Sequence, residues 1–195
     1  MIIDISQEIF SSQIYPGDPA PQKQKLSDIS QGDAYNLSAF SMCSHNGTHI
    51  DAPSHFLPQG ATIDQLSPDI FVGPAYVATY EGEIGAGEAQ GILEQAAQAG
   101  RRCAERLLLR GRSLVTAEAA RIFANAKLKL IGCELLSFGP EETPAEVHII
   151  LLSAGVILLE GLRLQHVQDG AYLLSAMPLN LGGCEGAPCR AVLLS

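Results

Sequence analysis

The residues from His45 to His55 place three of the chain's five histidines close to a carboxylate, Asp51. Neutral imidazole nitrogen and carboxylate oxygen are ligands that suit zinc and its first-row neighbours. His45 and His49 are four residues apart, Asp51 follows two residues later, and Gly47 can supply a sharp turn between them. One short segment can therefore direct three ligands at one ion. A set without a thiolate is more often catalytic than structural, which predicts metal-assisted activation of water.

Two further residues could complete this chemistry. His55 lies four residues beyond Asp51 and past Pro53, so it is expected near the metal without binding it, as a general acid/base. Glu160 ends an apolar run, where an unpaired carboxylate would be costly to bury, and a metal would satisfy it. Taken alone, Glu160 would instead be a strand-end residue turned to solvent, and His148 a structural histidine on a helix.

Hydrophobic periodicity and turn signals predict the elements that position these ligands. Strands are expected over residues 1–6, 36–43, 70–80, 105–110, 128–133, 156–159, 171–177 and 191–194, and helices over 87–98 and 116–127. A third helix should begin at Thr143-Pro144-Ala145-Glu146, with Thr143 as N-cap, and end before Gly155. The pattern indicates a mixed α/β fold. Gly47 and Pro53 disfavour a helix through the motif, so the ligands are expected on an irregular segment.

Composition restricts the protein's class and partners. The 195 residues suit one domain with a substantial core, and the net charge of −9 argues against nucleic-acid or anionic-membrane partners. The start of the chain lacks the pattern of a signal peptide, and the most apolar run, residues 147–159, is too short to span a bilayer. Five cysteines without a CxxC pair indicate reduced thiols in a cytoplasmic protein.

The complete pattern His-x-Gly-Thr-His-x-Asp-x-Pro-x-His, from His45 to His55, is similar to the signature of the cyclase family of metal-dependent hydrolases. This family includes bacterial kynurenine formamidases and isatin hydrolases. The resemblance extends over nearly the whole chain, through Tyr15-Pro16-Gly17-Asp18, the spacing from His148 to Glu160, and Gly186-Ala187-Pro188-Cys189-Arg190 near the end.

The resemblance implies a compact domain of the swivelling β/β/α type over residues 1–195, with a mixed sheet and flanking helices, that forms a homodimer or homotetramer. It also implies that His45, His49 and Asp51 hold a first metal, that His148 holds a second, and that Asp51 and Glu160 bridge the two. His55 would be the proton shuttle. Because imidazoles dominate the ligand set, two zinc ions are expected, with manganese as the alternative. The reaction would be hydrolysis of an amide, formamide or lactam.

Three departures from the family pattern concern the substrate. Tyr15 stands where the formamidases carry a Trp that stacks on an aromatic substrate, a pocket loop is missing after Arg110, and Glu134 replaces an Asp. N-formyl-L-kynurenine is therefore one candidate substrate, and an isatin-like lactam is another. Two further hypotheses remain: a small-molecule or metal-binding protein without turnover, and a purely structural metal site, for which Cys43 is the cysteine nearest to the motif in the chain.

Overall fold

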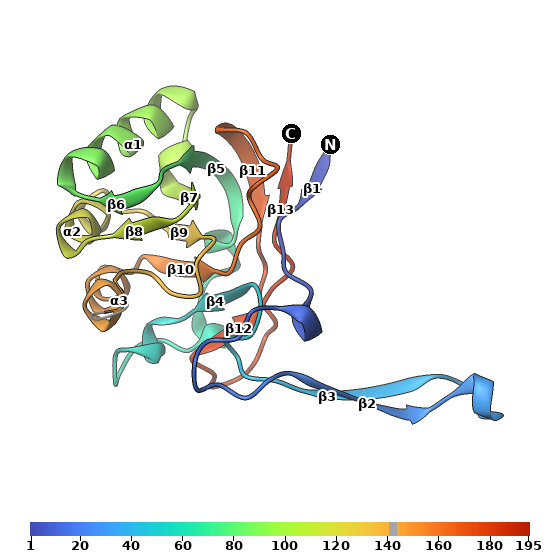
Figure 1. The fold of residues 1–195 in the computed structure, drawn as a ribbon. Coiled ribbons are helices and arrows are strands. Elements are labelled where there is room, and N and C mark those ends of the chain that lie inside the picture. Colours follow the sequence, from blue (N-terminus) through green and yellow to red (C-terminus); the bar gives the residue numbers. More distant parts are fainter. Residues whose placement is uncertain (141–143) are drawn as a thin grey trace.

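The computed structural model describes residues 1–140 and 144–195 and is built on one nine-stranded mixed sheet (Figure 1). The strand order is β1-β13-β11-β5-β7-β9-β10-β4-β12. Four neighbouring strands in the middle are parallel: β5 (Val72–Thr79), β7 (Arg106–Arg110), β9 (Leu130–Cys133) and β10 (Ile157–Glu160). The outer strands pair antiparallel: β11 (Gly170–Ser175), β13 (Val192–Leu194) and β1 (Ile2–Asp4) on one side, β4 (His49–Asp51) and β12 (Gly186–Pro188) on the other.

Three helices cover one face of this sheet, and Figure 1 shows them stacked along the same side. They are α1 (Ala86–Ala99), α2 (Ala117–Asn125) and α3 (Pro144–Ser153). Along β7, Leu107 and Leu109 pack in the helix-side core, whereas Leu108 packs in a second core on the opposite face. The central strands are therefore buried on both faces, as expected for parallel strands with apolar sequences. The predicted α/β class with a mixed sheet and flanking helices is confirmed.

Most predicted elements form close to their expected bounds. Thr116 caps α2 by accepting a hydrogen bond from the Ala119 amide, and Gly155 follows α3 with a positive φ of 78°. The expected N-cap of α3, Thr143, lies outside the described residues. Among the described residues, no helix is both long and apolar enough to cross a membrane.

The prediction of an irregular ligand segment is wrong for part of the motif. His49–Asp51 forms strand β4, which pairs with β10 and β12. Both partner strands come from distant parts of the sequence, so local periodicity could not reveal them. The segment after Arg110, where a pocket loop is missing, also forms a strand. Ser113–Val115 is strand β8, which pairs with β6 (Gly82–Ile84) before α2 begins.

A two-stranded hairpin projects from the body of the molecule (Figure 1). It consists of β2 (Gln22–Ser27) and β3 (Leu37–Ser41), and nearly all of its strand residues are exposed. β3 was expected, whereas β2, with sequence QKQKLS, lacks the apolar alternation that predicts a strand. At its base, Phe10 lies edge-on to Phe40 with ring centroids 6.4 Å apart, and the Lys23 ammonium lies 5.2 Å from the Phe10 ring.

Candidate metal centre

Strand β4 places two histidine-motif ligands on the helix-side face of the sheet. His49 and Asp51 are two residues apart and share a face, whereas Ile50 between them packs in the opposite core. In the antiparallel register with β10, His49 lies directly opposite Glu160. The next neighbour on this face is α3, which contributes His148. His49, Asp51, His148 and Glu160 are each at most 3% exposed.

The turn that precedes β4 is held by residues of the same motif. Gly47 has a φ of 71°, a conformation that favours glycine. The hydroxyl of buried Thr48 donates to the Gly161 carbonyl at 2.7 Å and accepts the Gln7 amide at 2.8 Å. Thr48 thus connects the motif to the residue after Glu160, which fixes β4 and β10 relative to each other.

The imidazole of His49 has a defined orientation. Its Nδ1 lies 3.0 Å from the Gly47 carbonyl oxygen, which can only accept, so Nδ1 carries a proton. Its Nε2 lies 3.3 Å from Asp51 Oδ1 and 3.4 Å from Glu160 Oε2. Burial opposes the charged ring, but the adjacent carboxylates of Asp51 and Glu160 outweigh burial and raise the pKa of His49 to about 10.

Asp51 is the central carboxylate of the site. Its Oδ1 also lies 2.9 Å from His45 Nδ1, and its Oδ2 lies 3.7 Å from His148 Nε2. Burial would raise the pKa of Asp51, but His45 and His49 hold this pKa well below its usual range. Asp51 is thus a charged carboxylate with no access to solvent.

Glu160 completes the arrangement. Its Oε1 accepts the Phe138 amide at 2.9 Å and lies 3.1 Å from His148 Nε2. The solvent-exposed alternative for Glu160 therefore does not describe its position, and His148 is a buried histidine beside this carboxylate. Both residues are buried in one cluster with Asp51.

The ligand atoms form two groups that share Asp51. One group is His45, His49 and Asp51, the other is Asp51, His148 and Glu160, and within each group the ligand atoms lie within 4.8 Å of one another. Among the described residues, His45 Nε2, His49 Nε2 and Asp51 Oδ2 are buried polar atoms without a hydrogen-bond partner. The unsatisfied His49 Nε2 and Asp51 Oδ2, together with two buried carboxylates, fit a divalent cation.

His55 lies beside this cluster, at the end of the short 3₁₀ helix Pro53–His55. Its ring stacks on His45 with centroids 4.1 Å apart and contacts the edge of Phe56 at 4.4 Å. Burial lowers the pKa of His55, with Asp51 opposing and His45 adding to the shift. A neutral ring at neutral pH can accept a proton.

Tyr15 and Cys43 are not members of the cluster. Tyr15 is 43% exposed in a turn closed by a hydrogen bond from the Asp18 amide to its carbonyl, and no contact with the histidines is seen in the described part of the chain. Burial raises the pKa of the Cys43 thiol, and the charges of Asp18 and Glu185 add to this shift. Neither ligand group among the described residues contains a cysteine.

Three residues near the site were missed by sequence reasoning. Glu185 places a carboxylate oxygen 3.4 Å from His45 Nε2, and Ser44 donates a hydrogen bond to the same oxygen. The backbone of Gly186 lies against the His45 ring, because an added Cβ would be 2.8 Å from its Cε1. Glu185 and Gly186 lie at the Gly-Ala-Pro segment that carries the C-terminal resemblance, which was the available signal.

The Glu134 side chain connects two segments of the backbone. Its two carboxylate oxygens accept the amides of Gly111 and Leu164, each at 2.7 Å. The carboxylate therefore connects the turn after β7 to the segment after β10.

Comparisons with known proteins agree with this geometry. Residues 3–140 match the family described as putative cyclase. The kynurenine formamidase of Salinibacter ruber is 33% identical over 98% of this chain and 96% of that protein. The kynurenine formamidase of Delftia acidovorans is 34% identical over 97% of this chain and 95% of that protein.

Solved structures show the same fold. A potential metal-dependent hydrolase with cyclase activity has a TM-score of 0.82 and 28% identity, covering 99% of this chain and 96% of its own. Isatin hydrolase A from Labrenzia aggregata has a TM-score of 0.82 at 21% identity, covering 99% of this chain and 93% of its own, and shows the fold alone. With its buried histidine and carboxylate cluster and these full-length relatives, the chain belongs to the putative cyclase family and is a metal-dependent hydrolase.

Proposed function

We propose that the protein hydrolyses the carbon–nitrogen bond of a small formamide, with N-formyl-L-kynurenine as the first candidate, at a centre of two divalent cations. The observation that carries this proposal is Asp51, which belongs to both ligand groups and is fully buried. A carboxylate with two oxygens can serve two ions only when the other ligands lie on both sides of it. His45 Nδ1 and His49 Nε2 lie 2.9 and 3.3 Å from Asp51 Oδ1, whereas His148 Nε2 lies 3.7 Å from Asp51 Oδ2.

The donor set favours zinc. Imidazole nitrogens come from His45, His49 and His148, and carboxylate oxygens come from Asp51 and Glu160. This combination suits zinc, whereas manganese prefers sites made mostly of oxygen ligands. Two divalent cations would also balance the two buried carboxylates. Such ions activate water and polarise the carbonyl under attack.

The chain's own residues supply proton transfer and substrate contact. His55 is half-buried beside the ligands, and its lowered pKa leaves it neutral and able to take a proton from the attacking water and return it to the leaving amine. Tyr15 offers an exposed aromatic face, which suits an aryl substrate. Residues 1–195 would act as one catalytic domain.

The test measures zinc content and hydrolysis of N-formyl-L-kynurenine for the wild type, Asp51→Asn and His55→Ala. Wild-type protein should bind two zinc ions and turn over. Asp51→Asn should lose activity and at least one ion, and His55→Ala should lose rate with its metal intact. Full metal content and full turnover in Asp51→Asn would refute the proposal. Hydrolysis of an isatin-like lactam in place of the formamide would change the proposed substrate to a lactam. Ligand binding without any hydrolysis would indicate a binding protein.

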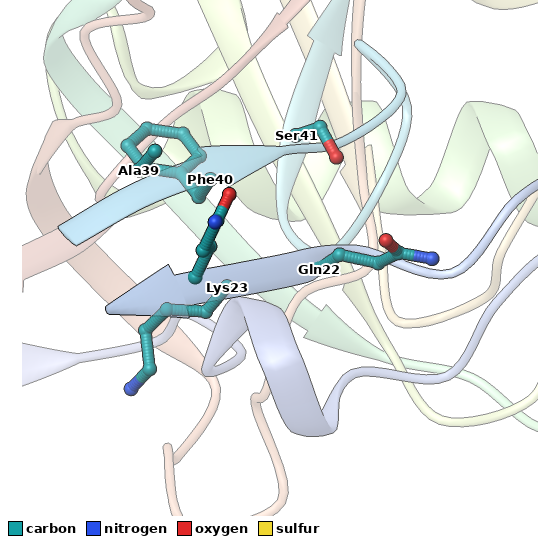
Figure 2. Close-up of a pocket in the computed structure, with 6 residues that line it drawn as sticks. Gln22, Lys23, Ala39, Phe40 and Ser41 are labelled. Carbon is teal, nitrogen blue, oxygen red and sulfur yellow. The ribbon is translucent and has the colours of Figure 1, made fainter. Parts of the chain in front are cut away.

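We also propose a homodimer or homotetramer in which the β2–β3 hairpin packs on a second copy. Leu26, Ile29, Tyr35 and Leu37 on this hairpin are each 45–59% exposed. A two-stranded hairpin is marginally stable alone, and exposed large apolar side chains on a projecting element mark an interaction surface. Figure 2 shows a hollow near its base lined by both strands, with Lys23 extending away from them.

The charge of the hairpin is compatible with this partner. Its lysines, Lys23 and Lys25, are balanced by Asp28 and Asp33, so the hairpin is neutral although the whole chain carries −9. Light scattering should give a dimer or tetramer mass for the wild type and a smaller species for the Leu26→Asp, Leu37→Asp double variant. A monomeric wild type would contradict this part of the proposal.

A cytoplasmic location is proposed from the cysteines. All five are free thiols in the structure, as a reducing compartment would maintain them. Mass spectrometry after alkylation of freshly lysed cells should find all five modified, and disulfide-linked peptides would contradict the location.

A further inference from the structure

Glu185 stands at the edge of the metal centre, directly before β12. Its backbone carbonyl accepts the Ala52 amide at 2.8 Å, which fixes this segment against the end of β4. Its side chain is 43% exposed, accepts a hydrogen bond from the Ser44 hydroxyl, and places Oε1 3.4 Å from His45 Nε2. Both the backbone and the side chain of Glu185 are therefore held in place beside His45.

The two nitrogens of His45 face different surroundings. Nδ1 lies 2.9 Å from Asp51 Oδ1, and His49 Nε2 lies 3.3 Å from the same oxygen. His45 Nδ1 and His49 Nε2 therefore converge on the same Asp51 oxygen, whereas His45 Nε2 faces Glu185, which belongs to neither ligand group.

The ring of His45 is held on several sides. His55 stacks on it, and the backbone of Gly186 lies so close that an added Cβ would be 2.8 Å from His45 Cε1. These contacts restrict the plane of the ring but do not choose which nitrogen carries the proton. Nε2 is buried and has no hydrogen-bond partner in the described structure, and the Glu185 oxygen lies 3.4 Å from it.

We propose that Glu185 is a positioning residue for the metal centre: its carboxylate accepts a hydrogen bond from the Nε2–H of His45 and thereby presents the unprotonated Nδ1 to the ion. Ligating histidines commonly donate their other N–H to a carboxylate, which fixes the tautomer and makes the ligand more basic. Ser44 holds the carboxylate in place. This inference rests on the proposed function, because it assumes that His45 binds a metal.

The experiment titrates metal-free protein with zinc in competition with a chromophoric chelator. Glu185→Gln should weaken one of the two sites by about 10–100-fold and leave the other unchanged, as loss of such partners does. Ser44→Ala should have a smaller effect on the same site. Glu83→Gln, which removes the same charge from an exposed position on β6, should match the wild type.

A second measurement separates positioning from general structural damage. The melting temperature of metal-free Glu185→Gln should equal that of metal-free wild type. Its activity should fall at limiting zinc and return when zinc is in excess, because the site is weakened and not destroyed. A misfolded variant would not be rescued by zinc.

Three results would overturn the inference. Unchanged affinity at both sites in Glu185→Gln would show that the carboxylate does not support His45. Permanent loss of one zinc equivalent at saturating metal would show that Glu185 is itself a ligand. Equal weakening of both sites would show a non-specific charge effect. If wild-type protein bound no metal, or Asp51→Asn kept both ions, the proposed function would fail instead.

Discussion

Glu134 offers a direct test of how the segments around the central strands are held together. Its carboxylate accepts the amides of Gly111 and Leu164, both at 2.7 Å, and so connects the turn after β7 to the segment after β10. In Glu134→Gln, one oxygen remains as an acceptor and the other becomes an NH₂ group. One of the two backbone amides then faces a donor, and the surviving bond loses its charge.

The magnitude follows from these two bonds. A hydrogen bond to a charged group contributes about 1.5–3 kcal/mol, and the half-buried position of Glu134 places the loss toward the lower end, at about 2 kcal/mol. For a chain of this length, 1 kcal/mol corresponds to about 2–4 °C in melting temperature. We therefore expect Glu134→Gln to melt about 4–8 °C below the wild type, while its zinc content stays unchanged.

The assay is thermal unfolding of metal-free protein followed by circular dichroism, with zinc content measured separately. Glu83→Gln, an exposed glutamate on β6, is the charge-matched control and should melt with the wild type. A melting temperature unchanged within about 1 °C would show that the Glu134 carboxylate does not hold the two segments. Loss of zinc at an unchanged melting temperature would place Glu134 in the metal centre.

Three further predictions concern the site and its framework. Thr48→Val removes the buried hydroxyl that donates to the Gly161 carbonyl. Unfolding in urea should show that the free energy of unfolding falls by about 1–3 kcal/mol. An unchanged free energy of unfolding would show that this hydroxyl does not stabilise the fold. Because Asp51 and Glu160 raise the pKa of His49 to about 10, metal binding must displace a proton below that pH. Zinc affinity should therefore rise with pH by up to about tenfold per unit for one proton, whereas equal affinity at pH 6 and pH 9 would contradict the assignment. Chelation should leave a folded, inactive protein, because the two apolar cores do not depend on the metal; unfolding on chelation would instead support a structural metal site.

The sequence was sufficient for the parts of the protein that depend on local pattern. The spacing of His45, His49 and Asp51 predicted one group of ligands, and the strand-end position of Glu160 predicted a distant fourth donor. The apolar runs of the central strands and the signals at Thr116 and Gly155 predicted the α/β class, because periodicity and capping are local properties.

Only the tertiary structure determined how these parts meet. Strand β4 has only three residues, too few for a periodic pattern to predict it; it forms because β10 and β12 supply its hydrogen-bond partners. That register places His49 opposite Glu160 and brings α3 alongside with His148. Glu185 approaches His45 from a segment 140 residues later in the chain. Such long-range contacts follow from the packing of the whole sheet, which no stretch of sequence encodes by itself.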